Sequence, residues 1–88
     1  MATKDTPSRF TGVRTTGLGG RFFLTRDTAT YVLGDVEVFI WRLCDGRTPI
    51  AEIADRLSRT YEVGQAQALT DVTEFVEELT QARLLEEV

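Results

Sequence analysis

The chain of 88 residues contains no histidine, one cysteine, two prolines and one lysine. Without histidine it lacks the commonest general base and a principal zinc ligand, which argues against most hydrolytic and metal-dependent chemistry. Cys44 has no partner for an internal disulfide, which is typical of a reducing cytoplasm. No apolar run approaches the ~20 residues of a membrane-spanning helix, and the N-terminus lacks the apolar segment of a secretion signal. We therefore expect a cytoplasmic protein with no metal, no cofactor and no membrane contact.

The length and the charge distribution indicate one small domain with two unlike halves. A chain of this size can bury one modest core. Residues 1–48 carry seven Lys/Arg and five Asp/Glu (net +2), whereas residues 49–88 carry three Arg and nine Asp/Glu (net −6). The polar residues 1–9 are expected to form a loose tail, and residues 10–88 the folded domain.

The first half of the domain has the pattern of an antiparallel meander. Residues 10–16, 21–25 and 29–33 are rich in aromatic and β-branched side chains, which favour strands. The glycine-rich run 17–20 can supply the positive φ angles of a hairpin turn, and residues 26–28 form a second short turn. Three strands in sequence with short turns predict a three-stranded antiparallel sheet.

The second half predicts three helices. The first spans 36–44, with Asp35 as its N-cap and Gly46 as its stop. The second begins at Pro49 behind a Thr48 cap and runs to Tyr61 with apolar residues at the helical period. The third spans 65–83, and a following Leu-Leu pair closes the core. The predicted class is therefore α+β, with a winged helix-turn-helix outline.

Two helical faces leave alternatives open. On a helical wheel of the third helix, Ala68, Phe75 and Ala82 form one edge of the apolar stripe, next to Asp71 and Glu78. This edge is either part of an ordinary core-facing helix or the wall of a groove. On the first helix, Val38 and Trp41 point away from the main apolar face. They are either buried on a second side or exposed as a patch for a partner or a homodimer.

The sequence favours binding over catalysis. Cys44 lies at helical spacing with Trp41 and has no histidine partner, so it fits a packed residue better than a nucleophile. A winged-helix DNA-binding regulator is the principal alternative, with the third helix as the recognition helix. That helix carries four acids, however, and DNA affinity depends on Lys and Arg that neutralise phosphates. We therefore expect no enzyme activity and no nucleic-acid partner.

An ordered set of short motifs resembles the PqqD-like peptide chaperones, the precursor-recognition elements of pathways that modify ribosomally made peptides. The resemblance covers residues 10–86. Gly34 departs from the asparagine usual after the third strand, and Val36-Glu37-Val38 replaces a small Thr-Gly pair. The residues that carry the resemblance are Tyr31-Val32-Leu33, Ile40-Trp41-Arg42-Leu43, Asp45-Gly46, Ile50-Ala51-Glu52-Ile53-Ala54, Leu57, Tyr61, Asp71-Val72, Phe75-Val76, Leu79 and Leu84.

The resemblance implies a non-catalytic module that binds the leader of a precursor peptide as an added strand, between the third strand and the third helix, and presents it to a separate maturation enzyme. Lasso-peptide, radical-enzyme and cyclodehydratase pathways all use such modules. Leader Lys or Arg would meet the two acids of the third helix, and apolar leader residues would pack on Phe75 and Val72. The implied peptide-binding residues are Thr30, Tyr31, Val32, Leu33, Ala68, Asp71, Val72, Phe75, Glu78 and Ala82.

Overall fold

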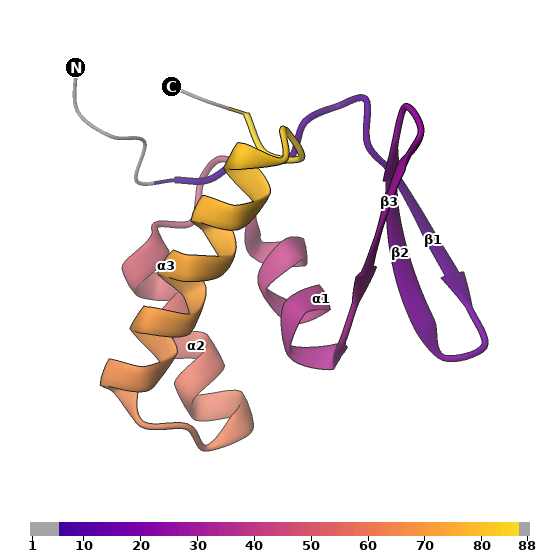
Figure 1. The fold of residues 1–88 in the computed structure, drawn as a ribbon. Coiled ribbons are helices and arrows are strands. Elements are labelled where there is room, and N and C mark those ends of the chain that lie inside the picture. Colours follow the sequence, from indigo (N-terminus) through magenta and orange to yellow (C-terminus); the bar gives the residue numbers. More distant parts are fainter. Residues whose placement is uncertain (1–5, 87–88) are drawn as a thin grey trace.

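The computed structural model describes residues 6–86. It confirms the predicted α+β architecture, with a three-stranded antiparallel sheet followed by three helices (Figure 1). The elements are β1 (Arg14–Leu18), β2 (Arg21–Arg26), β3 (Ala29–Leu33), α1 (Asp35–Leu43), α2 (Ile50–Tyr61) and α3 (Gln65–Gln81).

The sheet has the order β1-β2-β3, so β1 and β3 are its two edges. Gly19 and Gly20, with φ angles of +61° and +79°, form the two-residue turn between β1 and β2. Asp27, with φ of 55°, begins the equally short turn between β2 and β3. Positive φ at the first position of a two-residue loop matches the right-handed twist of the strands that it joins.

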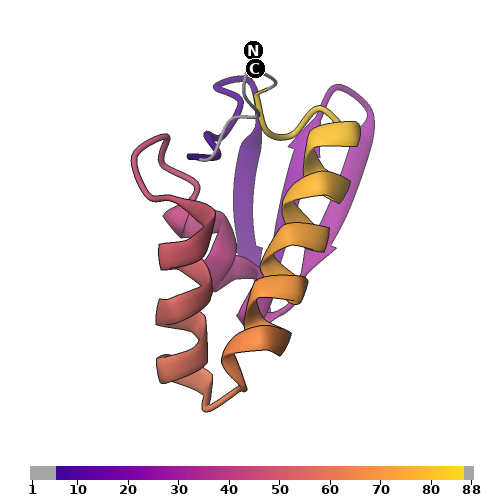
Figure 2. The same ribbon diagram turned by 90° about the vertical axis from the view of Figure 1, so that its left-hand side faces the viewer.

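All three helices lie on one side of the sheet, and the core fills the space between (Figures 1 and 2). Leu24 and Leu33 face this core from the sheet, and Ile40, Leu57 and Val72 reach it from α1, α2 and α3. The alternation along β3 follows from the pleat, since Leu33 is buried while Val32 is 57% exposed.

The helix ends differ in detail from the predicted ones. Asp35 is the first residue of α1 instead of its cap, and the Glu37 carboxylate accepts a hydrogen bond from the Gly34 N–H at 2.7 Å. Thr48 does not cap α2, because Pro49 is the N-cap and not the first helical residue. The Thr48 hydroxyl and N–H donate instead to the Asp45 carboxylate. Asp45 closes the loop before α2, and burial of Thr48 fixes that loop against the core.

The third helix ends two residues before the predicted boundary. Arg83 adopts a left-handed conformation with φ of 63°. The Leu84 N–H then donates to the Leu79 carbonyl and the Arg83 N–H to the Thr80 carbonyl. This pair of bonds is a Schellman motif, which reverses the chain and satisfies the last helical carbonyls. It turns Leu84 and Leu85 into the core, as the sequence predicted.

The N-terminal segment differs from the predicted structure in two ways. Residues 1–5 of the expected tail lie outside the described residues, but Ser8 and Arg9 form β-bridges with Asp45 and Leu85. The described part of the tail is therefore paired with the domain. The first strand begins at Arg14 instead of position 10, because the chain first makes a tight turn in which the Val13 N–H donates to the Phe10 carbonyl.

Val38 and Trp41 of α1 were expected to be either buried on a second side of the helix or exposed as a patch. Both are buried, with 7% and 5% of their surface exposed, so α1 packs on more than one side. The interpretation of these two residues as an exposed patch is therefore wrong. They are already covered by their own domain and offer no surface for a homodimer.

Candidate functional site

The outer edge of β3 offers unpaired backbone groups. In antiparallel sheets, hydrogen-bonded and non-hydrogen-bonded pairs alternate, and the pair that closes a two-residue turn is hydrogen-bonded. Arg26 and Ala29 are that closing pair, so Tyr31 and Leu33 also bond to β2. The N–H and C=O groups of Thr30 and Val32 consequently point away from the sheet. Between residues 6 and 86 no hydrogen bond from outside the sheet reaches them.

The open edge ends at a defined point. Gly34 is the next position whose N–H would point outward, but that N–H donates to the Glu37 carboxylate. The free stretch of β3 therefore comprises two outward-facing residues, Thr30 and Val32. Because each carries one donor and one acceptor, an incoming strand could form about four main-chain hydrogen bonds.

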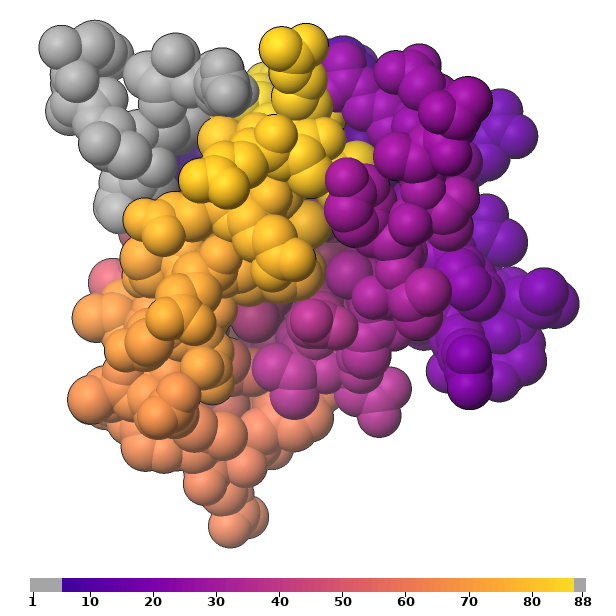
Figure 3. Space-filling model, viewed as in Figure 1, coloured from indigo at the N-terminus to yellow at the C-terminus, as the bar shows by residue number. Residues whose placement is uncertain are grey.

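A groove of about 520 Å³ lies where β3 passes into α1, opposite the middle of α3. Its apolar surface comes from Val36, Ile40 and Phe75. In the space-filling view, α1 reaches the surface between α3 and β3 (Figure 3). Gly34 also lines the groove and directly follows β3, so a strand paired with β3 would lead into it. The other residues that line the groove are Asp35, Glu37, Asp71, Glu74 and Glu78.

The polar lining of this groove is entirely acidic. Glu37 is engaged with the Gly34 N–H, and Asp71 accepts a hydrogen bond from the Gln67 amide at 2.8 Å. The other three carboxylates are exposed, and no Lys or Arg lines the groove. Five carboxylates around an apolar floor produce a negative field over the opening, which favours ligands with positive and apolar groups.

The ten residues implied by the resemblance occupy different environments. Asp71, Phe75 and Glu78 line the groove, and Thr30 and Val32 lie exposed at the β3 edge. The remaining five lie largely inside the domain: Ala68 and Val72 are 0% exposed, Leu33 is 5% exposed, and Tyr31 and Ala82 are half-buried against the core. Those five side chains therefore contribute more to the core beneath the groove than to the surface that a ligand could contact.

Sequence reasoning missed the side of the groove formed by α1. Val36, Ile40, Asp35 and Glu37 stand opposite α3 there, and Glu74 completes the acidic lining of α3. The spacing of Val36 and Ile40, one helical turn apart, was a signal that they share a face. Which element that face opposes is decided by the packing of α1 against the rest of the fold.

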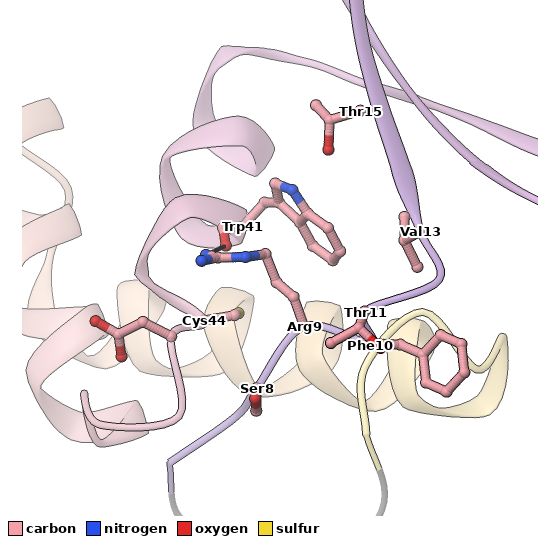
Figure 4. Close-up of a pocket in the computed structure, with 9 residues that line it drawn as sticks. Ser8, Arg9, Phe10, Thr11, Val13, Thr15, Trp41 and Cys44 are labelled. Atoms are coloured by element: carbon pink, nitrogen blue, oxygen red, sulfur yellow. Dashed lines mark hydrogen bonds between the residues drawn. The ribbon is translucent and has the colours of Figure 1, made fainter.

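A second hollow, of about 300 Å³, lies between the N-terminal segment and α1 (Figure 4). The Arg9 guanidinium lies 6.0 Å from the centre of the Trp41 ring, and it donates to the carbonyls of Trp41 and Arg42 at 3.0 and 2.9 Å. These bonds satisfy carbonyls at the C-terminal end of α1. Arg9 thus fastens the N-terminal segment to the helix, and its charge is engaged in doing so.

The chemistry of Cys44 follows from its burial. Its side chain is 0% exposed, and this burial raises the pKa of the Cys44 thiol to about 12. The thiol stays protonated at neutral pH, and a protonated thiol is a poor nucleophile. Within residues 6–86, no group of three Cys, Asp or Glu side chains is arranged to hold a metal ion. No helix in that range is long and apolar enough to cross a membrane.

The fold agrees with comparisons to known proteins. A family model described as coenzyme PQQ synthesis protein D (PqqD) matches residues 19–85. The chain belongs to the PqqD family. This membership confirms the resemblance drawn from the motifs, and the family match includes β2, β3, all three helices and the whole groove. The N-terminal segment that carries Arg9 precedes it.

A solved structure has the same fold as this PqqD-family chain. It is described as TbiB1 in complex with the TbiA(β) leader peptide. The two share 22% sequence identity with a TM-score of 0.79, and the match covers 90% of this chain and 94% of that one. None of the curated proteins matches the chain in sequence.

Proposed function

We propose that this chain captures the leader of a ribosomally made precursor peptide and presents it to a separate maturation enzyme. In this role it is a binding module and performs no chemistry itself. PqqD-family membership supports the proposal, as does the shared fold with TbiB1, which is described in complex with a leader peptide.

The observation that carries the proposal is the free edge of β3 beside the groove. A disordered peptide can add to such an edge as a further strand, because main-chain hydrogen bonds supply affinity and side-chain pockets fix the register. Thr30 and Val32 present outward N–H and C=O groups in the phase that strand addition needs. An open edge is otherwise an aggregation liability, and an incoming leader would cover it.

The groove then suggests which leader side chains are recognised. An apolar leader residue would pack on Phe75 and the neighbouring α1 residues, and a leader Lys or Arg would lie beside Asp71 and Glu78. A short induced strand buries roughly 1,000 Å², at the small end of specific interfaces. We therefore expect dissociation constants between about micromolar and nanomolar.

The alternative of a DNA-binding regulator has weaker physical support. Glu74, Glu77 and Glu78 are exposed on α3, and the helix contains no Lys or Arg. A recognition helix of this charge would repel the phosphates that flank the major groove. Retardation of duplex DNA at low salt is the simple measurement that would favour this alternative.

Titration of a leader peptide tests the proposal. A short reading frame encoding a precursor is sought beside the gene, and its fluorescein-labelled leader is titrated with the purified chain by fluorescence polarisation. Saturable binding at micromolar concentration or tighter is expected. If no leader encoded nearby binds, the proposed function is wrong although the fold stands.

The charge assignment has its own variants. The double change Asp71→Asn and Glu78→Gln should weaken leader binding and flatten its dependence on salt, because screening acts on the charges that it removes. Glu77→Gln is the matched control, since Glu77 is exposed on the same helix outside the groove. Because the double variant removes two charges and the control removes one, an equal effect per removed charge would show that only net charge matters.

A further inference from the structure

Gly34, at the junction of β3 and α1, keeps the conformation of a strand residue. Its φ and ψ angles of −83° and −179° are extended, and β3 runs directly into α1 at this point (Figure 1). Outward-facing backbone groups recur at every second residue of a strand, so the Gly34 N–H continues the series of Thr30 and Val32. By backbone direction alone, a leader strand on this edge would find a third donor at Gly34.

Both backbone groups of Gly34 already have partners, however. Its carbonyl accepts the first hydrogen bond of α1 from the Val38 N–H at 2.9 Å, and its N–H donates to the Glu37 carboxylate at 2.7 Å. A carbonyl of an incoming strand would have to stand at almost the same distance, about 2.9 Å, from the same N–H. The Glu37 carboxylate thus occupies the place that the leader backbone would take.

The hydrogen bond between Gly34 and Glu37 is stronger than the one that a leader could offer. A bond to an ionised carboxylate is shorter and roughly twice as strong as a bond to a neutral amide carbonyl. Glu37 is also half-buried in the groove wall and lies in the first turn of α1, where the helix dipole favours a negative charge. A leader that displaced Glu37 would lose hydrogen-bond strength and would gain nothing at the Gly34 carbonyl.

We propose that Glu37 is a specificity-determining residue that limits how much of the leader pairs with β3, a role that rests on the proposed function. Pairing is confined to the outward groups of Thr30 and Val32, a span of about three leader residues. At Gly34 the leader leaves the sheet and enters the groove beside the first turn of α1. The leaders that fit are therefore those in which a short extended segment is followed at once by a bend.

Two alanine variants separate the masking of Gly34 from the charge of the groove. Glu37→Ala frees the Gly34 N–H, and alanine is well tolerated in a helix. Asp35→Ala is the matched control, since Asp35 is an acid of the same helical turn and lines the same groove, whereas the Gly34 N–H donates to Glu37. Urea unfolding of both variants checks that each is folded under the conditions of the binding assay.

The test is a backbone-ester scan of the leader, measured by fluorescence polarisation. Each peptide bond of the leader encoded beside the gene is replaced in turn by an ester, which weakens the carbonyl acceptor, removes the N–H donor and keeps the side chains. Thr30 and Val32 each supply one donor and one acceptor. About four consecutive ester positions should therefore each weaken binding to the unaltered chain, by about two- to tenfold.

Glu37→Ala should add one further sensitive position, at the next peptide bond beyond this run, because the freed Gly34 N–H then donates to a leader carbonyl. Asp35→Ala should keep the run of the unaltered chain. The extra position in the unaltered chain or in Asp35→Ala, or its absence in Glu37→Ala, would overturn the role of Glu37. Failure of the unmodified leader to bind would instead refute the proposed function.

Discussion

Replacing Val32 by proline should separate leader binding from folding. The Val32 N–H points away from β2, so proline removes a donor from the free edge and leaves the β2–β3 ladder intact. Proline is tolerated in edge strands at positions of this kind. Its ring also occupies the space that the backbone of an incoming strand would take.

The expected magnitudes follow from this geometry. One lost hydrogen bond of about 0.5–1.5 kcal/mol, with added steric exclusion, should weaken leader binding by about 1–2 kcal/mol, or ~5–30-fold. The unfolding free energy should fall by no more than about 1.5 kcal/mol, within the total of roughly 4–13 kcal/mol expected for a domain of this length. The domain should therefore remain folded while it loses affinity.

Two further variants make the measurement decisive. Val32→Ala removes the same exposed side chain and keeps the N–H, so the difference between proline and alanine isolates the backbone. Tyr31→Pro removes an N–H that bonds to β2 and a half-buried ring, and should cost more than about 3 kcal/mol of stability. Urea unfolding and leader polarisation supply both quantities. If Val32→Pro binds leader as tightly as Val32→Ala, strand addition on this edge is refuted.

Three other outcomes are expected. Phe75 is 7% exposed, so Phe75→Ala should lower the free energy of unfolding by about 3–5 kcal/mol. Phe75→Leu is therefore the better probe of leader binding. An unchanged leader affinity in Phe75→Leu would mean that the ring makes no contact with the leader. The Cys44 thiol, with its pKa raised to about 12, should resist alkylation at pH 8 until urea unfolds the chain, and fast labelling of the native domain would contradict its burial. Hydrogen bonds from the N–H groups of Arg47 and Thr48 lower the pKa of Asp45. The Asp45 carboxylate therefore stabilises the folded state at neutral pH, and this stabilisation is lost as the pH falls through that lowered pKa. Asp45→Asn should flatten the acid limb of the stability profile measured by urea unfolding, and an unaltered limb would contradict the assignment.

The order of the strands and helices could be predicted from the sequence alone. β3 was predicted at its observed bounds, because alternating apolar residues and flanking turns are local signals. The apolar period of α2 and α3 and the return of Leu84 to the core are also properties of short windows. The motifs that indicated the family are local as well, and they lie within the matched residues 19–85.

Which of these residues a ligand could reach depends on how the elements pack together. Ala68 and Val72 share the apolar stripe with Phe75, yet they are sealed in the core while Phe75 opens onto the groove. A helical wheel gives the direction of a side chain but not what stands opposite. The N-terminal bridge from Arg9 to Leu85 joins residues from opposite ends of the chain, so no local pattern could reveal it.

The same reason applies to the two surfaces on which the proposals rest. The period of two in β3 assigns Thr30 and Val32 to one face, but only the register with β2 shows that their backbone groups face outward. The groove exists because a core drawn from β2, β3 and the three helices places the first turn of α1 opposite the middle of α3. Exposure is a relation between distant parts of the chain, and it is fixed only when the whole core is packed.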